Sequence, residues 1–171
     1  MGPTQRLINQ FAAQGHPLGR SIPEEEAATL IEVLQKRLGA SAKELDLSPS
    51  SLNRLEQRLI DLHQSMQEQG QIFTDEELVQ LVREIAAYIG KVFVTHAGGK
   101  WETVKTLWGT EIVFEGPVEA VKGKEIRVYP KSVSSLGNIA ASTWDAITVG
   151  IKPKLYDVYR RASAKRVREQ L

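Results

Sequence analysis

Residues 74–99 constrain the fold most, because they carry the longest helical apolar stripe in the chain. Thr74 and Glu77 fit a capping box, in which two side chains bond the free N–H groups at the start of a helix. Gly98 and Gly99 close the stretch, and glycine adopts without steric cost the left-handed backbone in which many helices end. Apolar side chains recur between these signals at helical spacing: Leu78, Leu81, Val82, Ile85, Ile89, Val92 and Phe93, with His96 extending the stripe. The sequence predicts a long helix that forms the spine of the fold.

Two shorter helices are predicted upstream of the spine. Ser21 and Glu24 fit a second capping box, and Gly39 supplies a stop. Ser48 is expected to cap the other helix, with Pro49 at the first helical position. Apolar side chains follow at helical spacing in both segments: Ala27, Leu30, Ile31, Leu34 and Leu38 in the first, and Leu52, Leu55, Leu59, Leu62 and Met66 in the second. Each segment therefore has one face to bury.

Beyond Gly99 the hydrophobic pattern changes from that of a helix to that of strands. Four short segments are rich in β-branched and aromatic residues and are separated by turn residues: 101–106, 111–115, 118–121 and 125–129. A last helix is expected after Pro153, with Leu155, Val158 and Tyr159 facing inward. This order predicts an α+β fold, in which N-terminal helices pack on a small antiparallel sheet of about four strands and a C-terminal helix follows.

The length of 171 residues is that of one domain with its own core. We expect residues 1–20 to form an N-terminal arm, either loose or as a short leading helix. A single domain is expected at 21–171, with helices in 21–97, the sheet in 100–130 and a helical segment in 131–171. The chain has no cysteine, which excludes disulfides and thiolate chemistry. It has no run of about 18 apolar residues, so we expect no transmembrane segment and a cytoplasmic protein.

The stretch Gly98-Gly99-Lys100 has two interpretations, a phosphate-binding loop or the end of a helix. A Walker loop follows a strand and ends in Lys and then Ser or Thr, so that the phosphate meets the first N–H groups of the next helix. In this chain the order is reversed, because a helix precedes the glycines and strand-like sequence follows. Trp101 also occupies the place of the hydroxyl residue. We interpret the glycines as the end of the helix.

No constellation of residues predicts a chemical site. His16, His63 and His96 are far apart in the sequence and lack the paired spacing of a metal site. His96 extends the apolar stripe, so we expect it to be partly buried. The serines between 132 and 135 stand outside the Gly-x-Ser-x-Gly pattern of a nucleophile elbow. We therefore expect no catalytic residue, no metal and no cofactor, whereas a pocket that joins His96 to a carboxylate would indicate an enzyme.

Two sets of residues are candidates for contacts with other molecules. Trp108, in an expected hairpin turn, and Tyr129 are candidates for protein contact, because aromatic side chains supply large contact areas. Residues 152–171 contain seven basic and two acidic side chains, and the candidates for phosphate contact are Arg160, Arg161, Lys165 and Arg166. A solvated helix face is the alternative for this basic cluster, since the helix dipole also favours cations near a C-terminus.

Three stretches together resemble a pattern in small bacterial proteins of unknown function: LDLSPSSLNRLEQRL, ELVQLVREIAAYIGKVFVTHAGGKWE and KGKEIRVYPKSV. In that pattern a serine-started helix leads to a helix with Ala-Tyr-Leu-Gly, and a Gly-x-Trp transition then leads into short strands. The resemblance spans about residues 41–135 and implies a bacterial α+β domain in which Gly90 lets another element approach. It implies no catalytic residues. Some such proteins belong to toxin, immunity or defence systems, which implies a protein-binding role by analogy.

These observations predict a non-enzymatic protein that binds a partner protein or a second copy of itself. The alternative is binding of nucleic acid or an anionic surface through the basic C-terminal helix. The two functions differ in salt dependence, because electrostatic binding to phosphates weakens steeply as salt rises.

Overall fold

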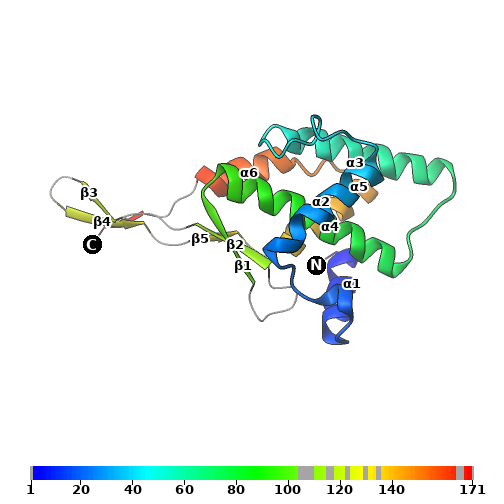
Figure 1. Cartoon of the computed structure of the whole chain (residues 1–171), viewed down its shortest axis with the longest axis horizontal. Helices are drawn as coiled ribbons and strands as arrows, with labels where there is room; N and C mark the ends of the chain where they lie inside the picture. Colours follow the sequence, from blue (N-terminus) through cyan, green and yellow to red (C-terminus); the bar gives the residue numbers. More distant parts are fainter. Residues whose placement is uncertain are drawn as a thin grey trace.

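The computed structural model describes the backbone of residues 2–103, 110–114, 118–121, 124–128, 131–133, 136–164 and 168–170, and the side chains of residues 2–103 and 136–162. The described part contains six α-helices (Figure 1). Their bounds are α1 (Pro3–Ala13), α2 (Ala27–Leu38), α3 (Ser51–Glu68), α4 (Asp75–His96), α5 (Leu136–Thr148) and α6 (Leu155–Ala164). Two 3-10 turns, Pro17–Gly19 and Glu24–Glu26, lie between α1 and α2.

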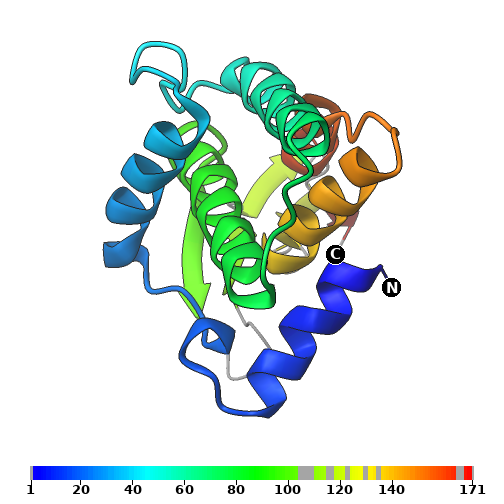
Figure 2. The same ribbon diagram turned by 90° about the vertical axis from the view of Figure 1, so that its right-hand side faces the viewer.

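The central helix is α4, with α2 on one side and α5 on the other (Figure 2). Its buried residues lie all round the helix: Val79, Leu81, Val82, Arg83, Glu84, Ile85, Ala86, Ala87, Tyr88, Ile89, Gly90, Val92 and Phe93. A helix that is buried all round needs cover on every side, and neighbouring helices supply much of it. The predicted spine helix is confirmed together with its capping box. Thr74 Oγ1 accepts the Glu77 N–H at 3.2 Å, and Glu77 Oε1 accepts the Thr74 N–H at 3.1 Å.

The prediction of an α+β fold on a four-stranded sheet is wrong. The described part of the chain is mostly helical, and β1 (Gly99–Thr103) is the single strand whose side chains the structure describes. The remaining short strands are β2 (Thr110–Phe114), β3 (Val118–Val121), β4 (Lys124–Val128), β5 (Lys131–Val133) and β6 (Arg168–Gln170). Their backbones pair antiparallel in two separate ribbons, β1–β2–β5 and β3–β4–β6, and the second extends away from the helices in Figure 1. The fold differs from the prediction because the helices bury their apolar faces around α4 and not on a sheet.

The turn from α4 into β1 confirms the interpretation of the paired glycines. Gly98 has a φ of +71°, the left-handed conformation that glycine adopts without strain, and β1 begins at the next residue. Trp101 of β1 then packs against Gly90 of α4, where an added Cβ would lie 2.5 Å from the Trp101 ring. The Trp101 indole donates its N–H to the carbonyl of Ile22 at 2.9 Å. The expected close approach at Gly90 is therefore confirmed, and the aromatic ring of Trp101 supplies it.

The starts of α2 and α3 differ from the predictions. The capping box of Ser21 and Glu24 does not form, because a 3-10 turn precedes α2 and no side chain caps it. The Glu24 carboxylate instead lies 3.3 Å from the ammonium group of Lys91. The start of α3 lies three residues later than Ser48. The hydroxyl oxygen of Ser48 nevertheless accepts the N–H of Ser51 at 3.2 Å, so Ser48 serves the first turn of α3 from outside the helix.

Within the predicted N-terminal segment, residues 2–20 contain α1 and a 3-10 turn, and α1 packs against α4 and α5. Asp145 of α5 accepts hydrogen bonds from the N–H group and the hydroxyl group of Thr4, so a neighbouring helix caps α1. The buried Arg83 of α4 donates to the carbonyl of Arg20 at 2.6 Å, and burial lowers the pKa of its guanidinium group. Both contacts attach the N-terminal segment to the core.

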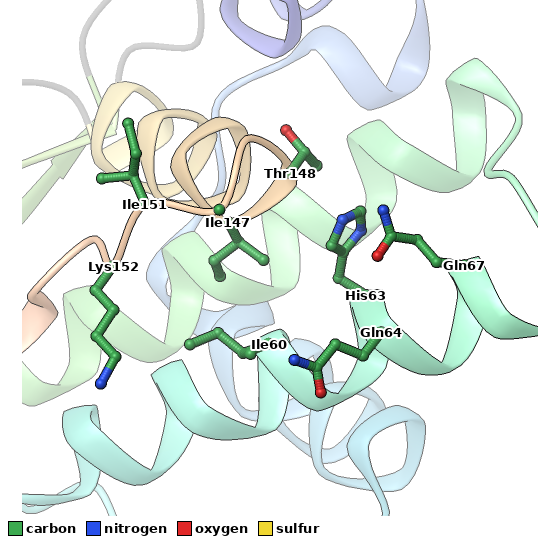
Figure 3. A pocket seen from close by; sticks show the side chains of 9 residues that line it. Ile60, His63, Gln64, Gln67, Ile147, Thr148, Ile151 and Lys152 are labelled. Atoms are coloured by element: carbon green, nitrogen blue, oxygen red, sulfur yellow. The ribbon is translucent and has the colours of Figure 1, made fainter.

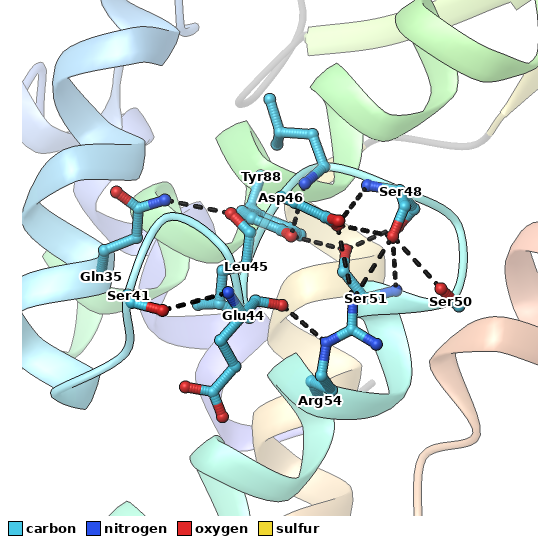
Figure 4. A network of polar contacts seen from close by, with 11 residues as sticks. Gln35, Ser41, Glu44, Leu45, Asp46, Ser48, Ser50, Ser51, Arg54 and Tyr88 are labelled. Carbon is cyan, nitrogen blue, oxygen red and sulfur yellow. Dashed lines mark hydrogen bonds and ion pairs between the residues drawn. The ribbon is translucent and has the colours of Figure 1, made fainter.

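Tyr88 of α4 anchors the loop between α2 and α3 from inside the protein (Figure 4). Its side chain is fully buried, and its hydroxyl oxygen accepts the Leu47 N–H at 3.0 Å. The Ser51 hydroxyl donates to the carbonyl of Ser48, so the Tyr88 hydroxyl donates its own proton to Ser51 Oγ. Leu47 has a φ of +65°, a left-handed backbone that costs a non-glycine residue about 1 kcal/mol or more. The Tyr88 hydroxyl therefore stabilises a loop conformation that the backbone itself disfavours.

Replacing Tyr88 by phenylalanine is expected to lower the free energy of unfolding by about 1–3 kcal/mol, because the Leu47 N–H loses its acceptor inside the protein. Burial raises the pKa of the Tyr88 hydroxyl, which means that the folded state favours the neutral form. This contribution to stability is complete below the unfolded pKa of about 10 and is lost as the pH rises through the higher folded pKa.

Urea denaturation between about pH 8 and pH 11 checks this prediction. The stability of the wild type should fall more steeply at the alkaline end than that of Tyr88→Phe. The stability of Tyr88→Phe should still decrease somewhat at alkaline pH, because burial also raises the pKa of Tyr159. Tyr156→Phe is the matched control, because Tyr156 is exposed, and it should keep the steep fall of the wild type. Identical slopes for Tyr88→Phe and wild type would show that Tyr88 does not contribute.

Candidate functional site

The segment Val149–Lys152 leads from α5 towards α6 and exposes two large apolar side chains; we call it the α5–α6 ridge. Val149 is 69% exposed and Ile151 is 61% exposed. The ridge follows a Schellman end of α5, in which Gly150 has a φ of +78° and the Ile151 N–H donates to the carbonyl of Ala146 at 2.8 Å. In this motif the residue in the position of Ile151 commonly packs back onto the helix. Because Ile151 stays largely exposed instead, the ridge combines a fixed backbone with apolar side chains that remain accessible.

A groove of 290 Å³ lies between the α5–α6 ridge and α3 (Figure 3); we call it the α3 groove. Its apolar lining comes from Ile60 of α3, Ile147 of α5 and Ile151 of the ridge. The rest of the lining consists of His63, Gln64, Gln67, Thr148, Gly150 and Lys152. The half-buried His63 ring meets Trp144 edge-on, with ring centroids 5.7 Å apart, which fixes one side of the groove. The groove therefore combines apolar surface with two side-chain amides, a hydroxyl group, an imidazole ring and one ammonium group.

A second groove, of 370 Å³, lies on the α6 side of the same ridge; we call it the α6 groove. Its lining residues are Asn138, Ile139, Ser142, Thr143, Ala146, Ile151, Lys152, Pro153 and Val158. Ile151 and Lys152 line both grooves, so these two residues form the boundary between them. The hydroxyl of Thr143 already donates to the carbonyl of Ile139 at 2.7 Å. The α6 groove thus presents a mainly apolar wall next to the same ammonium group.

The α5–α6 ridge is held in place on its α6 side by α3. The N–H of Leu155, the first residue of α6, donates to the Glu56 carboxylate at 3.0 Å. Leu155 itself is buried, and Tyr159 packs against Phe93 of α4 with ring centroids 5.1 Å apart. A carboxylate at a helix N-terminus stabilises the helix by pairing with its free N–H groups and its dipole. The ridge therefore runs between a defined helix end and a defined helix start.

Of the residues predicted for phosphate contact, the structure describes Arg160 and Arg161. Arg160 and Arg161 lie exposed on α6. Arg160 is 3.7 Å from the carboxylate of Asp157, and the Nε–H of Arg161 donates to the Asp157 carbonyl at 3.3 Å. Both guanidinium groups thus have partners in their own helix. Four other predicted contact residues lie outside the described residues: Trp108, Tyr129, Lys165 and Arg166.

The expectation of a partly buried His96 is wrong, because His96 is exposed in the last turn of α4, beyond the reach of the core. His16 stacks on Phe11, and its Nδ1 accepts the Leu18 N–H at 3.0 Å. In the part of the chain that the structure describes, no three His, Asp or Glu side chains gather in a way that suits a metal ion.

Reasoning from the sequence missed the α5–α6 ridge. The spacing of apolar residues in 139–149 is ambiguous, and the end of α5 was not recognised. A signal was present in Gly150, which follows Trp144 and Ile147 and stops the helix. That signal locates the helix end, although it does not reveal that Ile151 is exposed.

No match was found when the chain was compared with protein families, with curated proteins and with solved structures. The resemblance of residues 41–135 to small bacterial proteins therefore stays a prediction. None of the helices that the structure describes has both the length and the apolar character needed to cross a bilayer.

Proposed function

We propose that this protein is a non-enzymatic protein-binding module and that the α5–α6 ridge is its contact surface. The observation that carries the proposal is the exposure of Ile151, which lines two adjoining grooves, together with the exposure of Val149 two residues before it. A partner that covers these side chains removes apolar surface from water, which stabilises a complex by about 25 cal/mol per Å². Exposed apolar surface that adjoins a groove is typical of binding sites.

The wider setting of this proposal comes from the sequence alone. A cytoplasmic location is part of the proposal, and so is a role in a toxin, immunity or defence system, by analogy with the small bacterial proteins that the chain resembles.

Binding of nucleic acid or an anionic surface through α6 has weaker support, because Arg160 and Arg161 already have partners in α6. Duplex DNA is the probe that tests it. DNA binding that falls steeply between about 50 and 200 mM salt, and that is lost in the double variant Arg160→Glu/Arg161→Glu, would favour this function over protein binding.

Site-specific photocrosslinking tests the proposed contact surface directly. A photoreactive amino acid is placed at position 151 of the full chain, which is expressed in the cells where the protein naturally occurs. Position 72 is the matched control, because Ile72 is 90% exposed on the connection between α3 and α4 and lines neither groove. We expect a discrete protein adduct from position 151 and none from position 72. Adducts of equal yield at both positions, or none at either, would contradict the proposal.

Replacing Ile151 by serine is expected to weaken binding of the crosslinked partner by about tenfold or more, the effect of removing one large apolar side chain from an interface. The melting temperature should stay close to that of the wild type, because Ile151 is mostly exposed in the free protein. Ile72→Ser should leave both the affinity and the melting temperature unchanged. Pull-down of the purified partner at several concentrations, with thermal melts of each variant, measures the two quantities. Equal affinity of wild type and Ile151→Ser would exclude the ridge as the contact surface.

A further inference from the structure

We infer that the ligand of the α5–α6 ridge is an acidic, apolar segment of a partner protein, which places apolar side chains in both grooves and a carboxylate beside Lys152. This inference rests on the proposed protein-binding function and specifies the chemistry of the partner. Its basis is the distribution of charge around the ridge.

Among the described residues that line the two grooves, none carries a carboxylate. Among the same residues, Lys152 is the one Lys or Arg, and it lines both grooves. It is exposed and forms no ion pair with any side chain that the structure describes. A ligand that crosses from one groove to the other therefore passes an uncompensated ammonium group.

Two nearby carboxylates are engaged elsewhere. Glu56 accepts the N–H of Leu155 at the start of α6, and Asp157 lies 3.7 Å from Arg160. Lys154, the next exposed cation along the chain, adds positive charge on the same connection. An incoming carboxylate thus gains an attractive contact, whereas an incoming ammonium group meets repulsion.

The apolar side chains decide between a protein segment and a phosphate backbone. Ile151 lies at the boundary of the two grooves, and Val149 is exposed two residues before it. A phosphate placed over these side chains would lose hydration and gain no polar contact from them. Apolar side chains of a peptide gain from the same contact. Two exposed apolar residues beside Lys152 and Lys154 fit an acidic, apolar peptide better than a polyanion.

Selection from a randomised library of 12-residue peptides tests this inference. The library is selected on the wild-type protein, and the peptides retained are those that bind wild type and Ile72→Ser but not Ile151→Ser. We expect these peptides to combine large apolar residues with Asp or Glu. In a parallel selection on Lys152→Glu, we expect peptides with basic residues in place of the acidic ones. The peptides selected on the wild type should bind Lys152→Glu with about fivefold lower affinity, which corresponds to the loss of one exposed ion pair.

The outcomes separate this inference from the proposed function. Selected peptides that need Ile151 but show no acidic bias, or show the same bias on Lys152→Glu, would overturn the charge inference and leave the protein-binding surface standing. If no selected peptide depends on Ile151 for binding, the inference is also overturned. The crosslinking experiment at position 151 tests the proposed contact surface independently of this result. Because the Lys152 side chain is exposed, Lys152→Glu should keep the melting temperature of the wild type, and this result confirms that the variant is folded.

Discussion

Replacing Trp101 by alanine is expected to destabilise the protein by about 3–5 kcal/mol, the range found when a buried aromatic side chain is truncated. The Trp101 ring is only 8% exposed and covers Gly90 at the centre of α4. Its indole N–H also donates to the carbonyl of Ile22, so the variant loses a hydrogen bond between β1 and the segment before α2. Chemical denaturation, with the slope checked for two-state behaviour, measures the loss.

Two further variants separate the causes of this loss. Trp101→Phe keeps a ring over Gly90 and should recover part of the stability, although the bond to Ile22 is still missing. Gly90→Ala should destabilise the wild type, because its Cβ would lie 2.5 Å from the ring of Trp101 and 2.7 Å from Leu136. In the Trp101→Ala background the same substitution should cost less. Additive effects of Gly90→Ala and Trp101→Ala would show that the two residues do not pack together.

Replacing Arg37 by alanine is expected to destabilise the protein by about 3 kcal/mol, the lower end of the range for breaking a buried ion pair. The carboxylate of Glu84 in α4 is fully buried and accepts two parallel bonds from the Arg37 guanidinium, at 2.8 and 2.9 Å. The hydrogen bonds to Glu84 raise the pKa of Arg37. Without Arg37, the buried charge keeps only the bond from Gln80. Urea denaturation at neutral pH measures the difference.

Arg58→Ala is the matched control for this prediction. Arg58 and Glu44 form an equally short bidentate pair, at 2.7 and 2.8 Å, but both side chains are about one third exposed. Water therefore screens the pair, and its removal should change the stability far less. The double variant Arg37→Leu/Glu84→Leu should also lose less than Arg37→Ala, since it leaves no unpaired buried charge. Equal losses in Arg37→Ala and Arg58→Ala would contradict the role assigned to burial.

The helices of this fold could be predicted where their signals are local. The capping box of Thr74 and Glu77 and the helix stops at Gly39 and Gly98 depend on a few neighbouring residues, and the structure confirms all three. The fold class could not be predicted in the same way. Small residues of α4 such as Ala86 and Gly90 do not register as part of an apolar stripe, yet they let other elements pack closely. The sequence therefore indicated a helix with one apolar face, whereas α4 is buried all round.

The candidate site depends on which apolar residues remain uncovered, and that is a property of the whole fold. Gly150 marks the end of α5 in the sequence, but the neighbouring residues do not indicate that the side chain of Ile151 stays exposed and does not pack onto the helix. The basic residues of α6 stood out by composition, yet the structure shows Asp157 pairing with two of them. The basic stretch 152–171 is thus partly compensated within α6, whereas Lys152 of the same stretch forms no ion pair with a side chain that the structure describes.

Backbone amide NMR can locate the contact surface that we propose for the α5–α6 ridge, because every described segment of the backbone reports separately. The isotope-labelled full chain is titrated with a peptide selected on the wild-type protein, and chemical-shift changes are mapped along the sequence. We expect the largest changes in residues 60–67 and 138–153, which line the two grooves. Changes confined to residues 156–164, on the basic face of α6, would contradict the proposed contact surface on the ridge.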